Sequence, residues 1–179
     1  MKISIKDITY SGIFTALTAI GAFISIPVGP VPITMQTFFV LLSGVMLGSK
    51  KALLSQSAYL ILGLAGLPIF AGFSGGLQTV LKPSFGFLIG MAAAAYIAGK
   101  ITESKEKTTL NITMAVLAGT AVIYAVGLPY MYYILNIMLV KNFDIAKILE
   151  IGMIIFIPGD ILKAVIAVIL GKKLRGRIF

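Results

Sequence analysis

The fold is decided by residues 8–49, which read ITYSGIFTALTAIGAFISIPVGPVPITMQTFFVLLSGVMLGS and contain no charged side chain across 42 residues. A membrane-spanning helix needs about 20 consecutive apolar residues, so this stretch is long enough for two helices. Pro27-Val28-Gly29-Pro30-Val31-Pro32 interrupts it, because closely spaced prolines cannot continue a helix. The stretch therefore predicts two membrane helices, over 8–26 and 33–48, joined by a short loop.

The same alternation of apolar runs and breaks continues along the chain. Lys50-Lys51 marks a water-facing turn, Gly66-Leu67-Pro68 interrupts the next apolar run, and Gly127-Leu128-Pro129 divides the one after it. Charged residues fill 100–107, and a polar segment precedes the final run. The sequence predicts an all-α integral membrane protein with a single membrane domain over 1–179. Its six transmembrane helices are expected over 8–26, 33–48, 52–66, 83–99, 110–126 and 151–171.

The composition supports lipid as the solvent for most of this chain. Hydrophobic residues make up 59% of the sequence and charged residues 12%, against roughly 25% charged residues in soluble domains. Cysteine and histidine are both absent, which excludes thiolate chemistry, the HExxH zinc motif and a Ser–His pair. We expect no catalytic residue, metal or cofactor, and no P-loop motif is present, so any ATP hydrolysis belongs to another subunit. A channel subunit would repeat polar residues along several helices, and that pattern is missing.

The formal net charge of +9 is distributed in short clusters between apolar runs. This distribution is a topology signal, since nucleic-acid binders gather their charge on one water-exposed face, and no nucleic-acid partner is expected. With six spans, the loops on one side carry Lys82, Lys141 and Lys147. The other side carries eleven cations and is expected to be cytoplasmic together with both termini: Lys2, Lys6, Lys50, Lys51, Lys100, Lys105, Lys107, Lys172, Lys173, Arg175 and Arg177. Met1–Asp7 is interpreted as the cytoplasmic lead of a retained first helix in a multi-pass protein of the cell membrane.

Asp160 and Lys163 lie three residues apart in the apolar segment of the last expected helix. This spacing puts both side chains on one helical face. A charge at mid-membrane costs roughly 2.5–3.5 kcal/mol on insertion scales, and such residues usually face a cavity or the bundle interior. The pair therefore indicates a binding site, while the alternative is a self-neutralising pair that only fixes helix packing.

Two expected outer loops, after the first and third helices, are apolar and rich in glycine and proline. Such backbone is tolerated at membrane depth only where it is buried in protein or lines a cavity. We interpret the loops as the lid and wall of a pocket, with Gly75 and Gly76 allowing close approach to a ligand; the alternative is a pair of tight interfacial connections. Gln36 and Gln78 suit either a ligand or a backbone carbonyl. Lys82 is either a snorkelling residue or a carboxylate partner.

The first expected helix carries small residues four apart, in the pairs Gly12/Ala16 and Thr15/Ala19. Small residues at this spacing let another helix approach closely. The pattern predicts a docking surface for a partner helix, and packing inside the six-helix bundle explains it equally well.

Three motifs in this sequence resemble those of one known family. The residues are Pro30-Val31-Pro32-Ile33-Thr34-Met35-Gln36-Thr37, then Gly66-Leu67-Pro68-Ile69-Phe70-Ala71-Gly72 with Gly75-Gly76, and finally Pro158-Gly159-Asp160-Ile161-Leu162-Lys163. In their order and spacing they resemble the BioY family, the biotin-specific S components of energy-coupling factor (ECF) transporters. The resemblance extends over nearly the whole chain. One departure is Lys82, which stands where family members often have glycine.

The resemblance implies a six-helix membrane subunit that binds biotin. Its implied partners are a transmembrane coupling protein, which docks on the small-residue face of the first helix, and two ABC-type ATPases. Biotin offers two ureido N–H donors, one ureido oxygen, an apolar ring and a carboxylate. Asp160 can accept a ureido N–H, and Lys163 can donate to the ureido oxygen or pair with the carboxylate; Lys82 is a second candidate for the carboxylate. The apolar ring is expected to contact Phe70, Phe85, Tyr59 and the glycine loops.

Three other functional classes stay open from the sequence. An S component for another vitamin, of the thiamine or riboflavin class, would have the same architecture. A non-catalytic structural membrane subunit is a second alternative, in which the charged pair only fixes helix packing. An intramembrane enzyme is the weakest alternative, since only Asp160, Lys163 and scattered hydroxyl groups are available to it.

Overall fold

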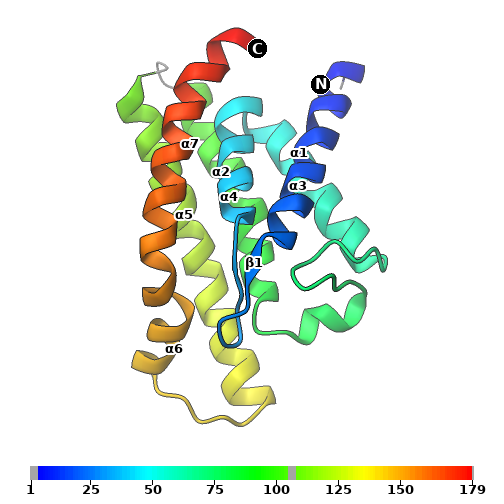
Figure 1. The fold of residues 1–179 in the computed structure, drawn as a ribbon, viewed down its shortest axis with the longest axis vertical. Coiled ribbons are helices and arrows are strands. Elements are labelled where there is room, and N and C mark those ends of the chain that lie inside the picture. The colour runs from blue at the N-terminus through cyan, green and yellow to red at the C-terminus, as the bar shows by residue number, and fades with distance from the viewer. Residues whose placement is uncertain (1–3, 105–107, 179) are drawn as a thin grey trace.

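The computed structural model describes residues 4–104 and 108–178, which form an elongated bundle of helices with the start of α1 and the end of α7 at the same end (Figure 1). Six helices correspond to the expected ones, and α6 is an additional short helix. The helices are α1 (Ile5–Phe23), α2 (Gln36–Leu47), α3 (Ser49–Leu64), α4 (Phe85–Ser104), α5 (Thr109–Tyr132), α6 (Ile145–Gly152) and α7 (Ile157–Ile178).

The expected charge asymmetry rests on eleven cations on one side of the membrane, and the structure describes only some of their side chains. Lys2, Lys105 and Lys107, and the side chains of Arg175 and Arg177, lie outside the described residues. The expectation of cytoplasmic termini therefore stays a prediction.

The first helix begins with a capping box. The Ser4 hydroxyl accepts a hydrogen bond from the Asp7 amide, and the Asp7 carboxylate accepts one from the Ser4 amide. Asp7 also forms an ion pair with Lys51 of α3 at 2.5 Å. The hydrogen bond from Lys51, with those from Ser4, lowers the pKa of Asp7 from 3.8 to about 2. The start of α1 is therefore tied to the start of α3.

The break between the first two helices is a short antiparallel hairpin. Strands β1 (Ser25–Ile26) and β2 (Ile33–Thr34) pair Ser25 with Thr34 and Ile26 with Ile33. Helix α1 therefore ends before the expected residue 26, and α2 begins after the expected residue 33. The difference arises because residues beside the proline-rich turn satisfy their backbone groups by pairing as strands.

The turn between α2 and α3 is shorter than expected. Gly48 alone separates the helices, so Lys50 and Lys51 belong to α3 and not to a loop. Gly48 has no side chain to cap α3, and Glu103 of α4 takes this role. The Glu103 carboxylate accepts hydrogen bonds from the Ser49 amide at 2.9 Å and the Ser49 hydroxyl at 2.7 Å. One acidic side chain therefore fixes the turn and lets α3 begin three residues before the expected residue 52.

The expected end of the fifth helix at residue 126 is wrong. Helix α5 continues through Pro129 and passes into a π-helix, η2 (Tyr133–Met138). From the sequence, the helix was expected either to end or to kink at Gly127-Leu128-Pro129, with 130–140 as a partial helix or a capping loop. The helix continues because in lipid a broken backbone has no water to bond. Continuing the helix, with a wider turn after the proline, keeps the Tyr133 amide bonded to the carbonyl oxygens of Pro129 and Tyr130.

The last expected helix, 151–171, corresponds to α7, and its first six residues belong instead to α6, η3 and the junction between them. Helix α6 begins after Asp144, whose side chain caps it, and the 3-10 turn η3 (Ile154–Phe156) joins α6 to α7. Pro158 lies in the first turn of α7, where its missing N–H has no helical partner to lose. Asp160 lies in the same turn.

Helix α2 forms the centre of the bundle and contacts α1, α3, α4, α5 and α7. Its residues from Val40 to Leu47 are all buried. The outer helices instead turn large apolar side chains outward, with Leu117 of α5 58% exposed and Ile161 of α7 60% exposed. In the described residues, three segments are long and apolar enough to cross a membrane, Phe85–Glu103, Thr109–Met138 and Ile145–Leu174. Large apolar side chains on the outside of the bundle are typical of a protein that is surrounded by lipid.

A line of buried polar side chains joins α1 to α3. The Ser11 hydroxyl donates to the carbonyl oxygen of Lys51, and the Thr15 hydroxyl donates to that of Ser55 at 2.9 Å. One turn further, the Gln56 amide donates to the Thr18 hydroxyl at 3.2 Å. We call these contacts the α1–α3 polar seam.

Candidate functional site

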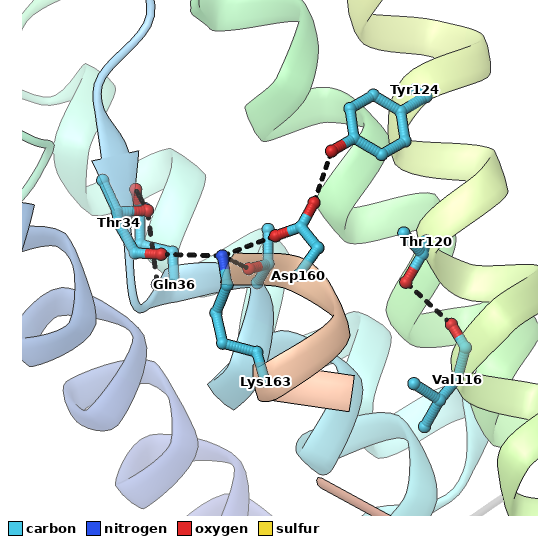
Figure 2. A network of polar contacts seen from close by, with 8 residues as sticks. Thr34, Gln36, Val116, Thr120, Tyr124, Asp160 and Lys163 are labelled. Atoms are coloured by element: carbon cyan, nitrogen blue, oxygen red, sulfur yellow. Dashed lines mark hydrogen bonds and ion pairs between the residues drawn. The ribbon is translucent and has the colours of Figure 1, made fainter. Parts of the chain in front are cut away.

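The structure brings Asp160 and Lys163 together on one face of α7, turned into the bundle (Figure 2). Lys163 Nζ lies 2.6 Å from Asp160 Oδ1, and the lysine is only 6% exposed. The spacing of three residues had predicted a shared face, and the geometry agrees. A charged pair removed from solvent in this way requires further partners to offset its desolvation.

Lys163 has all three of its donors occupied within the protein. Besides Asp160, its ammonium group donates to the carbonyl oxygen of Thr34 at 3.1 Å and to the hydroxyl of Thr37 at 2.8 Å. These partners come from β2 and the first turn of α2, so the lysine links α7 to the end of the hairpin. The ammonium group is thereby held in one position.

Asp160 has one oxygen that is only partly satisfied. The Tyr124 hydroxyl of α5 donates a hydrogen bond to Asp160 Oδ2. Asp160 Oδ1 is buried and, apart from the ion pair to Lys163, has no hydrogen-bond partner among the described residues. A carboxylate oxygen has capacity for more than one donor, so Oδ1 can accept a further N–H or O–H from a bound molecule.

Asp160, Lys163 and Tyr124 line the inner end of a cavity under the β1–β2 hairpin. Phe87 and Met91 of α4 belong to this inner end and also to an adjoining cavity of about 370 Å³, which extends outward beneath the loop between α3 and α4. The two cavities share these lining residues, and we refer to them together as the chamber, with the charged pair at its inner end and mainly apolar walls. This size and composition are typical of small-molecule sites.

Four other predicted ligand residues line the outer part of this chamber: Gln36, Phe70, Lys82 and Phe85. Gln36 is buried, and its amide donates to the Tyr59 hydroxyl at 2.8 Å and accepts from the Thr34 hydroxyl at 3.2 Å. The amide therefore bonds to side chains, and not to a backbone carbonyl as the alternative interpretation required.

The other four predicted residues belong to the framework of the loop and do not line the chamber. Tyr59 lies under Phe70, with ring centres 5.3 Å apart, and its hydroxyl donates to the carbonyl oxygen of Ile69. The Gln78 amide donates to the carbonyl oxygen of Gly75 at 2.6 Å, as its alternative interpretation required. A Cβ at Gly75 would collide with the carbonyl oxygen of Leu67, and Gly76 has a φ of +86°. These glycines therefore permit a tight loop, and they do not bring the loop backbone into contact with the chamber.

Sequence reasoning missed Thr37 and Tyr124 as members of the site, and it did not single out Thr34. Thr34 and Thr37 flank Gln36 in the proline-rich motif, so their position was a usable signal. Tyr124 lies in a long apolar run with no local signal. Tyr124 reaches Asp160 only because of how far α5 is displaced along its axis relative to α7.

The residues of the predicted docking surface on α1 are exposed only in part. Gly12 and Ala16 are exposed, Ala19 is half-buried, and a Cβ at Gly12 would meet no atom within 4 Å. Thr15 is buried and bonded to Ser55 in the α1–α3 polar seam, so its prediction as a docking residue is wrong. Thr15 lies at the edge of this surface that packs against α3, where its hydroxyl donates to the carbonyl oxygen of Ser55.

Helices that bury a charged pair beside a chamber, and expose apolar side chains to lipid, define a membrane protein with a site for a small molecule. The comparisons with known proteins are more specific. The sequence model of the BioY family matches residues 1–178, and the chain belongs to this family.

Two relatives match nearly their full length. A biotin transporter BioY of Thermotoga maritima is 39% identical over 170 residues, which cover 95% of this chain and 96% of the relative. A probable biotin transporter BioY of Pyrococcus horikoshii is 40% identical over 171 residues, covering 96% and 97%. Both are named as transporters, in agreement with the expectation of a protein without enzymatic activity.

A solved structure has the same fold. The crystal structure of the S component for biotin from an ECF-type ABC transporter aligns with a TM-score of 0.81 and 31% sequence identity, covering 97% of this chain and 92% of that chain. The prediction of an all-α membrane protein is confirmed by this match together with the helices described above.

Proposed function

We propose that this chain is the biotin-binding S component of an ECF-type uptake transporter. It captures biotin on the outer side of the cell membrane, and partner subunits hydrolyse ATP to drive import. The observation that carries the proposal is the buried Asp160 oxygen facing an apolar chamber, in a chain of the BioY family. The family relationship identifies the ligand, and the residues of the chamber account for the contacts that bind it.

Biotin complements the chamber group by group. One ureido N–H donates to Asp160 Oδ1, whose acceptor capacity is not filled within the protein. The ureido oxygen approaches Lys163 by replacing the long 3.1 Å contact to the carbonyl oxygen of Thr34. The thioether ring packs against Phe87 and Met91. The valerate tail extends along the outer chamber to Lys82, whose ammonium group pairs with the carboxylate.

The alternative vitamins suit this site less well. Thiamine carries a positive charge, and Asp160 is already neutralised by Lys163 at 2.6 Å, which leaves little attraction for a cation. Riboflavin has a larger ring system than the apolar part of biotin, and the inner cavity is small, at about 40 Å³. A structural subunit has no use for a buried oxygen acceptor beside a cavity.

The protein is proposed to cross the cell membrane several times, with both termini in the cytoplasm. The start of α1 and the end of α7 lie at the same end of the bundle (Figure 1). The cation-rich side expected from the sequence is the side that holds both termini, in accord with the positive-inside rule. The chamber then opens toward the opposite, outer side.

The partners are proposed to be a transmembrane coupling protein and two ABC-type ATPases. Gly12, Ala16 and Ala19 supply the surface of α1 on which the coupling protein packs. Exposed small residues of this kind permit close contact between helices in lipid, where packing and not hydrophobicity drives association.

Equilibrium binding of radiolabelled biotin to the detergent-purified protein tests the proposal. We expect saturable binding that biotin displaces and that thiamine and riboflavin do not. Protein that unfolds cooperatively on heating, but shows no biotin binding at micromolar concentrations, would contradict the assignment. Displacement by thiamine or riboflavin instead would assign the chain to another vitamin.

A further inference from the structure

A second cavity lies far from the chamber, at the end of the molecule that holds the start of α1 and the end of α7. It is an open groove of about 510 Å³ between the first turn of α5 and the last turns of α7. Val168 and Ile169 form its apolar wall, Lys172 and Lys173 form its polar rim, and Thr109 closes the side toward α5. The groove therefore combines an apolar wall with two cations.

The two lysines have no acidic partner in the part of the chain that the structure describes. Every described carboxylate is already engaged elsewhere. Asp7 pairs with Lys51, Glu103 caps α3, Asp144 caps α6, Glu150 pairs with Lys147, and Asp160 pairs with Lys163. Two adjacent cations at one groove, without an acidic partner among the described residues, favour the binding of an anion.

The apolar wall of the groove continues along the outside of α7. Ile169, Val165 and Ile161 follow one another at intervals of four residues and are 59%, 51% and 60% exposed. This spacing places them in one stripe that leads from the lysines toward the middle of the bundle. An anion that fits both parts must carry a long apolar chain.

We propose that this groove binds an anionic phospholipid, with its phosphate between Lys172 and Lys173 and an acyl chain along Ile169 and Val165. Basic pockets between helices at the membrane surface recognise lipid headgroups in this way. The lysine stems lie along the apolar wall, and their ammonium groups reach the phosphate at the level where hydrocarbon ends. The proposal is independent of the bound vitamin, because the groove shares no lining residue with the chamber.

Native mass spectrometry of the delipidated protein in detergent measures this binding directly. The protein is titrated with phosphatidylglycerol or with phosphatidylcholine of the same acyl chains, and the bound lipids are counted. We expect one tightly retained phosphatidylglycerol and no matching phosphatidylcholine. In the double variant Lys172→Gln/Lys173→Gln, the affinity for phosphatidylglycerol is expected to fall roughly thirtyfold, as the loss of two lysine–lipid contacts implies.

The charge-matched control is Lys50→Gln/Lys100→Gln. Both of these lysines are exposed, and neither lines the groove. The control removes the same charge and should retain the lipid. A second variant, Thr109→Tyr, fills the groove without changing its charge and should lose the lipid. Thermal unfolding of each variant checks that it is folded.

Three results would overturn the proposal. An equal loss in the Lys50/Lys100 control would show general attraction to a basic surface. Retention of the lipid in Thr109→Tyr would place it outside the groove. Displacement of phosphatidylglycerol by millimolar inorganic phosphate would make the site one for a free anion.

Discussion

Replacing Lys163 with methionine separates the two roles that the Asp160–Lys163 pair can have. Methionine keeps most of the volume but removes the ammonium group, which is 6% exposed and bonded to Asp160, Thr34 and Thr37. Removing one partner of a buried pair leaves an uncompensated charge and costs about 3–5 kcal/mol. For a chain of 179 residues, each kcal/mol lowers the unfolding temperature by about 2–4 °C, so we expect a fall of about 6–20 °C.

The double variant Asp160→Asn/Lys163→Met should recover most of this stability. Replacing both charges of a buried pair is often neutral, and the asparagine oxygen still accepts the hydrogen bond from Tyr124. Biotin binding should not recover, because the carboxylate that accepts the ureido N–H is gone. We expect its affinity to stay at least about tenfold below that of the wild type, or roughly 1.4 kcal/mol.

The assays are thermal unfolding in detergent, followed by circular dichroism, and equilibrium dialysis with radiolabelled biotin. If the double variant is as unstable as Lys163→Met alone, the unpaired carboxylate is not the cause of the loss. If the double variant binds biotin with wild-type affinity, the pair only fixes helix packing and the ligand lies elsewhere.

Four further predictions concern other parts of the structure. Tyr124→Phe should weaken biotin binding about tenfold, since it removes one hydrogen bond to a charged group, and unchanged dialysis data would exclude the tyrosine from the site. Lys82→Gly should weaken binding of biotin but not of its uncharged carboxamide analogue; an equal effect on both ligands would place the carboxylate elsewhere. Glu103→Gln should lower the free energy of unfolding by about 1 kcal/mol through a weaker cap on α3, with the distant Glu150→Gln as the matched control. The stabilisation that wild type gains over Lys51→Met should be full well above pH 3.8 and should be lost progressively as the pH falls through about 2, because the pKa of Asp7 is lowered from 3.8 to about 2 in the folded protein. A stabilisation that is unchanged at pH 2 would contradict this last prediction.

The six long helices and their order were predictable, although the short helix α6 was not, because lipid imposes a strict rule on the chain. Apolar runs must be helical, and the charged or proline-rich breaks between them are easy to locate. The boundaries were less predictable, as α5 demonstrates. Pro129 reads as a helix end in sequence, but its effect depends on whether water or lipid surrounds the backbone.

The site was predictable where its residues lie close together in sequence. The spacing of Asp160 and Lys163 is enough to place them on one face of a helix. Tyr124 comes from another helix, and its contact with Asp160 depends on how far α5 and α7 are displaced along their axes. Gly75 and Gly76 carried a signal for unusual backbone, but that signal does not distinguish a loop that touches a ligand from one that turns tightly on itself.

The α1–α3 polar seam has a mechanical consequence. In lipid, no water is available to replace a broken hydrogen bond. Separating α1 from α3 would therefore leave several buried polar groups without a hydrogen-bond partner at once. The two helices therefore tilt and shift as one rigid body. Gly12 and Ala16 lie on the outward face of α1. A protein that binds to them and displaces α1 therefore moves α3 as well. Tyr59 of α3 is bonded to Ile69, so the loop between α3 and α4 beside the chamber moves with it.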